Sequence, residues 1–246
     1  MNKNIRNTIE LLLSKKYYCE SAALSEKGTI FTVNPETNEL FVKILAYQNC
    51  VIVCTSRNVQ IKIEKLLRNR SRDEIFELPY VYGQTIHYVP DVNREYSRHI
   101  KSGYTSACIW GDDILSLIGI SGFGNSLSFD KTGKTSTKAI CIAKYNDKIV
   151  GIAGAAATST DGVWEVGVDV VIEHRNAGLA SYLTGALTKE LLAQEIVPFY
   201  SASVTNIGSQ MVANRCGYIP FWIDTFGTIF DKHYAYDKSI FMNDNF

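Results

Sequence analysis

The sequence has no excess of charge of either sign, with 25 Lys and Arg against 25 Asp and Glu among 246 residues. This balance disfavours a globally basic nucleic-acid-binding protein. Core-forming residues are not scarce, because hydrophobic residues make up 46% of the chain and aromatic residues 11%. That composition excludes a disordered chain. The length suits one large domain or two smaller ones.

Long hydrophobic runs are also missing. No stretch approaches the ~20 apolar residues that a bilayer-spanning helix requires. Near the amino terminus, the apolar run Ile9–Leu13 is interrupted by Glu10 and followed by Lys15 and Lys16. A secretory signal needs about 7–15 apolar residues, so this segment is interpreted as a short amphipathic helix. We therefore expect a cytoplasmic protein with no membrane partner.

Metal-binding patterns are absent as well. No Cys-x-x-Cys pair occurs, and the four histidines form no His-x-x-x-His pair, so no metal is expected. Most of the six cysteines stand among apolar residues, as buried free thiols do. We expect them to be reduced: Cys19, Cys50, Cys54, Cys108, Cys141 and Cys216.

Residues 1–110 are predicted to form a small amino-terminal α/β domain of unknown role. Two apolar runs, Leu40–Leu45 and Val51–Thr55, indicate a hairpin, and Val59–Leu67 has helical spacing with Asn58 as N-cap. The run Arg57–Arg72 holds six basic residues against one acidic residue. It could contact nucleic acid or an acidic partner, but such a run is more often a solvated helix face.

Residues 111–246 show a clearer alternation of strands and helices. An Asn146-Asp147 turn separates the first two predicted strands, and Gly217 follows the second predicted helix. Two further strands are expected between Tyr218 and Phe241. The predicted elements are strands at Ala139–Ala143, Ile149–Ala157, Val163–Ile172 and Phe199–Val204, and helices at Asn176–Glu195 and Asn206–Cys216.

The junction between the third strand and the first of these helices carries the chemical signal. Small residues at 177, 178 and 180 allow a ligand to approach the backbone. The free N–H groups of the first helical turn, together with the helix dipole, favour a phosphate. Arg175 adds a forked donor. The junction is therefore a candidate phosphate-binding site.

Arg175-x-x-Gly178-x-Ala180 resembles the signature with which the GNAT acyltransferase superfamily holds the pyrophosphate of acetyl-CoA. The strands before it are similar to the family's arrangement, and so are Asn206 to Ser209 and Gly217-Tyr218 after it. The resemblance implies an α/β (α+β) fold. Residues 111–246 would form a mixed, mainly antiparallel sheet flanked by helices. Residues 1–110 would resemble the amino-terminal extension of a bacterial GNAT subgroup.

The same resemblance implies a reaction and its site residues. The expected reaction is transfer of an acetyl group from acetyl-CoA to the primary amine of a small molecule, with no metal, by a monomer or homodimer. Backbone groups of Val168 and Val170 would hold the pantetheine arm if that strand splays from the next. The other implied coenzyme contacts are Arg175, Asn176, Ala177, Gly178, Leu179, Ala180, Asn206 and Ser209.

Catalysis leaves alternatives open. Glu165 stands where family members often have the general base, and Trp164 and Val166 could partly desolvate it; the other interpretation is a solvated carboxylate. Ala213 occupies the position where many family members have a Tyr that protonates the departing thiolate. The thiolate could leave unassisted or be protonated by solvent, or another residue could substitute. The remaining alternative is an inactive acyl-CoA-binding or regulatory module. The candidate tyrosines are Tyr200, Tyr218, Tyr234 and Tyr236.

The zero net charge conceals two unlike halves. Residues 1–110 hold 15 basic and 11 acidic side chains, whereas residues 163–246 hold 5 basic and 9 acidic ones. The half expected to bind an anionic coenzyme is thus the acidic one, so binding must depend on backbone amides, the helix terminus and Arg175. An acidic surround suits a cationic amine.

Overall fold

The computed structural model describes residues 3–78, 81–94 and 99–229. The chain forms two compact units, which are treated separately below. Unit 1 contains residues 1–9 and 88–220, and unit 2 contains residues 10–87 and 221–246. The sequence suggested a single boundary at 110/111. The units instead divide at 87/88, and the chain from residue 221 onward returns to unit 2, so strands β4 (Thr85–Pro90) and β10 (Tyr218–Asp224) each contribute to both.

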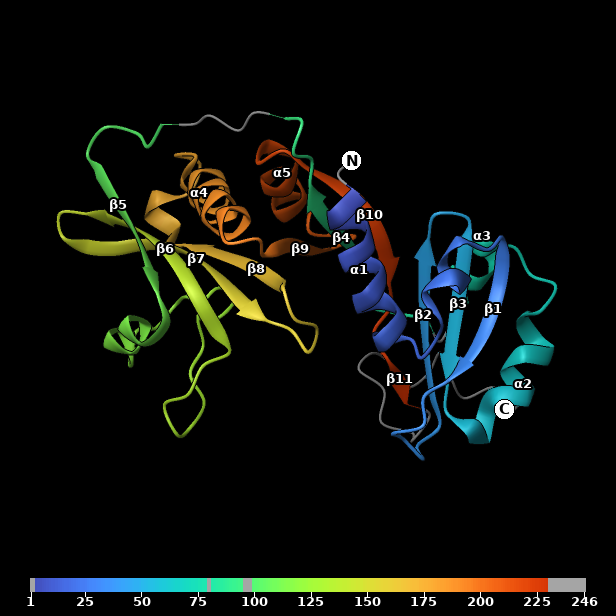
Figure 1. The fold of residues 1–246 in the computed structure, drawn as a ribbon. Coiled ribbons are helices and arrows are strands. Elements are labelled where there is room, and N and C mark those ends of the chain that lie inside the picture. Colours follow the sequence, from blue (N-terminus) through green and yellow to red (C-terminus); the bar gives the residue numbers. More distant parts are fainter. Residues whose placement is uncertain (1–2, 79–80, 95–98, 230–246) are drawn as a thin grey trace. The chain divides into compact units, whose positions relative to one another are not determined.

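Unit 1 is built on a mixed, mainly antiparallel sheet flanked by helices, as expected (Figure 1). Its strands run in the order β9-β8-β7-β6-β5, and every pair is antiparallel except β8 with β9. The elements are β5 (Tyr104–Trp110), η2 (Gly111–Leu117), β6 (Thr137–Tyr145), β7 (Lys148–Ala157), β8 (Val163–Val170), η3 (Ile172–His174), α4 (Leu179–Ala193), β9 (Val197–Ser203) and α5 (Ile207–Arg215).

Local turn chemistry explains the hairpin between β6 and β7. Asn146 and Asp147 have φ values of 48° and 61°, the left-handed conformation that both central residues of a type I′ turn require. Asn and Asp tolerate this region better than other side chains do. The predicted hairpin is confirmed, with Tyr145 opposite Lys148.

The two faces of the unit 1 sheet have different neighbours. Helix α4 packs against β6, β7 and β8. On the other face, an apolar cluster joins η2 and the segment after it to the sheet through Ile114, Phe123 and Leu127 against Ile140, Ile142 and Ile152. Because side chains alternate along a strand, Val166, Val168 and Val170 of β8 share one face, and Glu165, Gly167 and Asp169 share the other.

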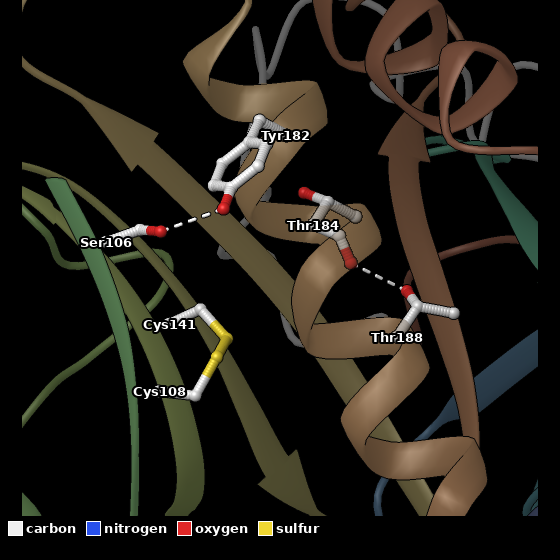
Figure 2. Close-up of a disulfide and its surroundings, with 6 residues drawn as sticks. All are labelled: Ser106, Cys108, Cys141, Tyr182, Thr184 and Thr188. Carbon is white, nitrogen blue, oxygen red and sulfur yellow. Dashed lines mark hydrogen bonds between the residues drawn. A yellow bond between two sulfur atoms is a disulfide. The ribbon is translucent and has the colours of Figure 1, made fainter. Parts of the chain in front are cut away.

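A disulfide corrects the expectation of six free thiols. Cys108 on the outer strand β5 lies directly opposite Cys141 on β6, and the two sulfur atoms are bonded (Figure 2). Cys108 is exposed, unlike its partner. The sequence could not indicate this pair, because the two cysteines meet only through the register of two strands 33 residues apart. Free thiols remain at Cys19, Cys50, Cys54 and Cys216.

Unit 2 contains a smaller sheet in the order β1-β3-β2-β10, in which β1 and β3 are parallel and β11 also pairs with β2. Apolar residues of β2 and β3 pack against α2 and α3 through Ile63, Leu67 and Ile75. The elements are α1 (Lys3–Lys16), which begins in unit 1, then η1 (Ser21–Ser25), β1 (Gly28–Val33), β2 (Phe41–Tyr47), β3 (Cys50–Thr55), α2 (Arg57–Leu67), α3 (Arg72–Phe76) and β11 (Thr228–Ile229).

One local expectation for this part of the chain needs correction, and another falls partly outside the described residues. Helix α2 begins at Arg57, so its N-cap is Ser56 and not Asn58, whose side-chain amide donates to the carbonyl of Asn38 instead. The last expected strand was placed as far as Phe241, but residues beyond 229 lie outside the described part of the chain.

A buried charge network stands in unit 2, and no sequence motif predicted it. Asp224 is 4% exposed and accepts hydrogen bonds from Lys16 Nζ (2.8 Å) and Tyr17 Oη (2.9 Å). His87 Nε2 lies 2.8 Å from its other oxygen, and Lys43 Nζ lies 3.8 Å away. Burial opposes ionisation, but the hydrogen bond and charge of His87 and the charges of Lys16 and Lys43 outweigh it. They hold the pKa of Asp224 well below its usual value.

This network predicts acid sensitivity. Since the folded-state pKa of Asp224 is depressed, its stabilising contribution is present above about pH 4 and is lost as pH falls below it. We expect Asp224→Asn to lower the free energy of unfolding at pH 7 by about 2–3 kcal/mol. The free energy of unfolding of the variant, measured by urea titration between pH 3 and 7, should also depend less steeply on pH than that of wild type. The exposed Glu39→Gln is the control; equal pH slopes for Asp224→Asn and wild type would contradict the prediction.

Candidate functional site

The turn before α4 brings the predicted phosphate-binding residues together. Asn176 (φ 60°) and Gly178 (φ 81°) are both left-handed, and α4 begins directly afterwards at Leu179. Arg175 Nε donates to the carbonyl of Val170 at 3.0 Å, which fixes the guanidinium beside the end of β8. The first-turn N–H groups of α4 have no partner within the helix. The turn thus presents backbone donors and one guanidinium to the same place.

Strands β8 and β9 separate at the point that the coenzyme interpretation requires. They pair in parallel from Val163 with Val197 to Val166 with Tyr200, and the pairing stops there. Residues from Gly167 to Val170 continue to pair with β7 alone. The edge of β8 that faces β9 is therefore open along these residues, as an extended ligand arm would need.

A cleft of about 440 Å³, here called the α4 cleft, lies along this open edge. It is lined by nine of the ten residues predicted to contact the coenzyme: Val168, Val170, Arg175, Asn176, Gly178, Leu179, Ala180, Asn206 and Ser209. The tenth, Ala177, lines a neighbouring hollow together with Gly178 and Leu179. His174 and Arg215 also line the cleft, and Arg215 adds a second guanidinium to the single Arg175 that the sequence suggested.

Asn206 and Ser209 at the start of α5 are engaged within the protein. Asn206 Oδ1 accepts from Ser209 N at 3.0 Å, which makes Asn206 the side-chain N-cap of α5. The hydroxyl of Ser209 lies 2.7 Å from that of Tyr200. The capping role of Asn206 is thus realised, and the same residue lines the cleft.

A second cavity of about 360 Å³, here called the Glu165 cavity, adjoins the α4 cleft. The two share five lining residues at the separation of β8 and β9: Asn125, Val168, Tyr200, Asn206 and Ser209. A molecule in the cleft would therefore have direct access to the cavity that contains Glu165.

Glu165 differs from expectation in its surroundings. Its side chain is exposed and accepts a hydrogen bond from Ser201 Oγ at 2.5 Å. Trp164 and Val166 do not desolvate it, because neighbouring residues of a strand point to opposite faces. The carboxylate is solvated and at the same time lines a cavity, so the two interpretations of Glu165 are not exclusive.

The segment 124–128 forms one wall of the Glu165 cavity and lies tightly on the sheet. A Cβ at Gly154 would come within 1.8 Å of the Ser126 carbonyl oxygen, and one at Gly167 within 1.9 Å of that of Asn125. These glycines face each other on β7 and β8. Asp169 accepts hydrogen bonds from the backbone and the side chain of both Asn125 and Ser126. The wall is held by backbone contact and by a carboxylate.

The structure separates the candidate acids. Tyr200 lines both cavities, and burial raises the pKa of its phenol, which keeps it protonated. Tyr218 is fully buried, bonds to Thr188 and lines neither cavity. Ala213 is also fully buried. Tyr234 and Tyr236 lie outside the described residues. Of the two candidates within the described residues, Tyr200 is the one that lines the cavities.

Several residues that line or support the two cavities could not be found from the sequence. Asp169 and Arg215 belong to no motif, and their contributions depend on how β8 and α5 are placed. Strand β5 contacts η3 and α4, on either side of the turn. Tyr104 Oη lies 2.9 Å from His174 Nδ1 in η3. Ser106 Oγ lies 2.8 Å from Tyr182 Oη in α4 (Figure 2).

The basic run at residues 57–72 lies outside the two cavities. In the basic run, Arg68 pairs with Glu64, and Arg70 and Arg72 donate to backbone carbonyls. Among residues 3–78, 81–94 and 99–229, no group of three His, Cys, Asp or Glu side chains is arranged to hold a metal ion. No helix within those residues is long and apolar enough to cross a bilayer.

The part of the chain that holds this site matches a known protein family. A model of the GNAT acetyltransferase family matches residues 102–220, a range that includes every residue lining the two cavities. No curated protein matches the chain.

Solved structures of low identity are similar to parts of the chain. One is a GNAT-family acetyltransferase from Novosphingobium aromaticivorans (14% identity, 59% of this chain, 63% of that one, TM-score 0.44). A second is a GCN5-related N-acetyltransferase-like protein from Streptococcus suis (15% identity, 72% of this chain, 71% of that one, TM-score 0.43). A third is a GNAT-family acetyltransferase from Colwellia psychrerythraea (14% identity, 76% of this chain, 65% of that one, TM-score 0.45). The match thus spans less than two thirds of the first and third of these chains. Residues 102–220 of the chain thus match the GNAT acetyltransferase family.

Proposed function

We propose that the protein is an N-acetyltransferase that transfers an acetyl group from acetyl-CoA to the primary amine of a small molecule. One observation carries this proposal: the α4 cleft and the Glu165 cavity meet where β8 and β9 separate. An acyl donor in the cleft and an amine beside Glu165 would approach each other through this opening.

The α4 cleft fits the coenzyme in both charge and shape. The N-terminus of α4, Arg175 and Arg215 suit the anionic pyrophosphate. The open edge of β8 after Val166 suits an amide-containing arm that adds to the sheet as a short strand. When bound, the coenzyme supplies an acetyl thioester with a thiolate leaving group.

The chain's own residues would manage two protons. An amine with a pKa near 10 is mostly protonated at neutral pH, so Glu165 takes one proton from it, directly or through water. As the carbon–nitrogen bond forms and the carbon–sulfur bond breaks, the nitrogen releases its second proton to solvent and the Tyr200 hydroxyl gives a proton to sulfur. Solvent then returns a proton to Tyr200 and removes one from Glu165.

The role of Tyr200 predicts a moderate effect on turnover. A thiol has a pKa near 8.5 and leaves without much help, so we expect Tyr200→Phe to lower kcat by only about tenfold. The affinity for acetyl-CoA should change little. Tyr218→Phe is the matched control, since Tyr218 lines neither cavity. Steady-state kinetics would contradict the assignment if both variants behaved alike.

The proposed function has a direct test. Acetyl-CoA at 100 times its dissociation constant should stabilise the fold by about 2.7 kcal/mol, which a thermal-shift assay would detect. Incubation with acetyl-CoA and a panel of amines should release free thiol and yield acetylated amine. An unchanged melting temperature would contradict coenzyme binding. Binding without turnover on any amine would favour the inactive acyl-CoA-binding module.

We also propose the cytoplasm as the compartment, on the four free cysteines. The Cys108–Cys141 disulfide is the observation against it, because disulfides are rare in reducing cytosol. Alkylation of the protein inside intact cells, followed by mass spectrometry, would decide: labelled Cys108 and Cys141 support the cytoplasm, and a protected pair contradicts it.

A further inference from the structure

We infer that the amine accepted in the Glu165 cavity is small, bears hydroxyl groups, and carries no carboxylate or phosphate. This inference rests on the proposed function and narrows its substrate class. It comes from what lines the cavity, namely one carboxylate, many hydroxyls and a fixed backbone wall.

Charge excludes anionic acceptors. Glu165 is the cavity's ionisable carboxylate, and of the described residues that line the cavity none is Lys, Arg or His. Asp169 adds a second carboxylate behind the wall, where Asn125 and Ser126 hold it. The arginines that line the adjoining space, Arg175 and Arg215, belong to the α4 cleft. A cationic amine would be attracted to this cavity, whereas a carboxylate or phosphate on the same molecule would find no cationic partner and would be repelled by Glu165.

Hydroxyl groups dominate the polar lining. Seven Ser and Thr side chains and Tyr200 line the cavity. Ser128 and Ser136 are both exposed, and within the described part of the chain neither hydroxyl has a hydrogen-bond partner. A hydroxyl both donates and accepts, so such a lining can pair with the hydroxyls of a ligand but gains little from an alkyl chain.

Size and rigidity limit the acceptor further. A volume of about 360 Å³ stands at the lower end of the ~300–1,000 Å³ range of ligand pockets. The wall cannot retreat towards the sheet, because the backbone at Asn125 and Ser126 already lies on Gly167 and Gly154. The cavity therefore suits a molecule of the size of an amino alcohol or an amino sugar.

The test compares acceptors that differ in one group. We would measure kcat/KM with acetyl-CoA for 2-amino-1,3-propanediol, serine and 2-aminopropane, and for glucosamine against glucosamine 6-phosphate. The kcat/KM for the diol should be at least about 100-fold higher than for serine and about tenfold higher than for 2-aminopropane. The kcat/KM for glucosamine 6-phosphate should be at least about 100-fold lower than for glucosamine.

An engineered charge gives an independent test. Ser136→Lys places a cation on the cavity lining and should raise the serine-to-diol ratio of kcat/KM at least about tenfold. Ser121→Lys adds the same charge at an exposed residue outside the lining and should leave the ratio unchanged. Wild-type turnover of serine or glucosamine 6-phosphate equal to that of the uncharged amines would overturn this inference and leave the proposed function standing. No turnover of any amine, with acetyl-CoA bound, would overturn both.

Discussion

Replacement of Glu165 by Gln is expected to lower kcat at pH 7 by about 10²–10⁴-fold, the range for loss of a general base. Gln keeps the size of the side chain and can still accept from Ser201, so the geometry of the cavity should persist. What is lost is the capacity to accept a proton from the ammonium form of the substrate. Acetyl-CoA affinity should remain, because Glu165 does not line the α4 cleft.

The pH profile distinguishes a base from a residue that only shapes the cavity. Without the base, turnover requires an amine that has already lost its proton, so the rate of Glu165→Gln should rise about tenfold per pH unit up to the amine pKa, about 10. The exposed Glu190→Gln, on α4 and outside both cavities, is the matched control. A Glu165→Gln profile that parallels wild type at a reduced level would place the base elsewhere.

Features that depend on a few consecutive residues were predictable from the sequence. The β6–β7 hairpin follows from Asn146-Asp147, whose left-handed φ values suit that turn. The start of α4 is an exception: the helix was expected to begin at Asn176, but Asn176 and Gly178 are left-handed and α4 begins at Leu179. The same locality explains why the predicted coenzyme contacts gather: most of them lie within one turn and the strand before it.

Features that depend on distant segments were not predictable. Strand β10 pairs with β2 across more than 170 residues, with Trp222 opposite Tyr47, and this pairing moves the end of the chain into unit 2. The Asp224 network assembles groups from four segments, and Cys108 meets Cys141 only through strand register. Sequence periodicity indicates which residues are apolar, but not which strand lies beside which.

Glu165 and Tyr200 combine a feature that the sequence indicates with surroundings that depend on distant segments. Motif position indicated Glu165, yet its exposure and its bond to Ser201 depend on β9, which follows in the chain. Four tyrosines were equal candidates in the sequence because the usual position is Ala213. The separation of β8 and β9 after Tyr200 makes that residue accessible from both cavities. Burial encloses Tyr218 instead.

Gly178→Glu is expected to weaken acetyl-CoA binding by at least about 100-fold, since juxtaposed like charges cost several kcal/mol. A Cβ at Gly178 would meet no atom within 4 Å, so the added carboxylate would enter the space where the anionic pyrophosphate is proposed to bind. The substitution also strains the backbone, because Gly178 has a φ of 81° and a side chain in that region costs about 1–2 kcal/mol.

Gly178→Asn separates these two causes. Asn tolerates the left-handed region and carries no charge, so it retains most of the backbone effect and removes the repulsion. Calorimetric titration with acetyl-CoA should show a dissociation constant within about tenfold of wild type for Asn and at least about 100-fold above it for Glu. Raising the salt concentration should narrow the difference, since the repulsion is electrostatic. Equal weakening by Asn and Glu would mean that Gly178 acts through the conformation of the turn, and that the pyrophosphate lies away from the N-terminus of α4.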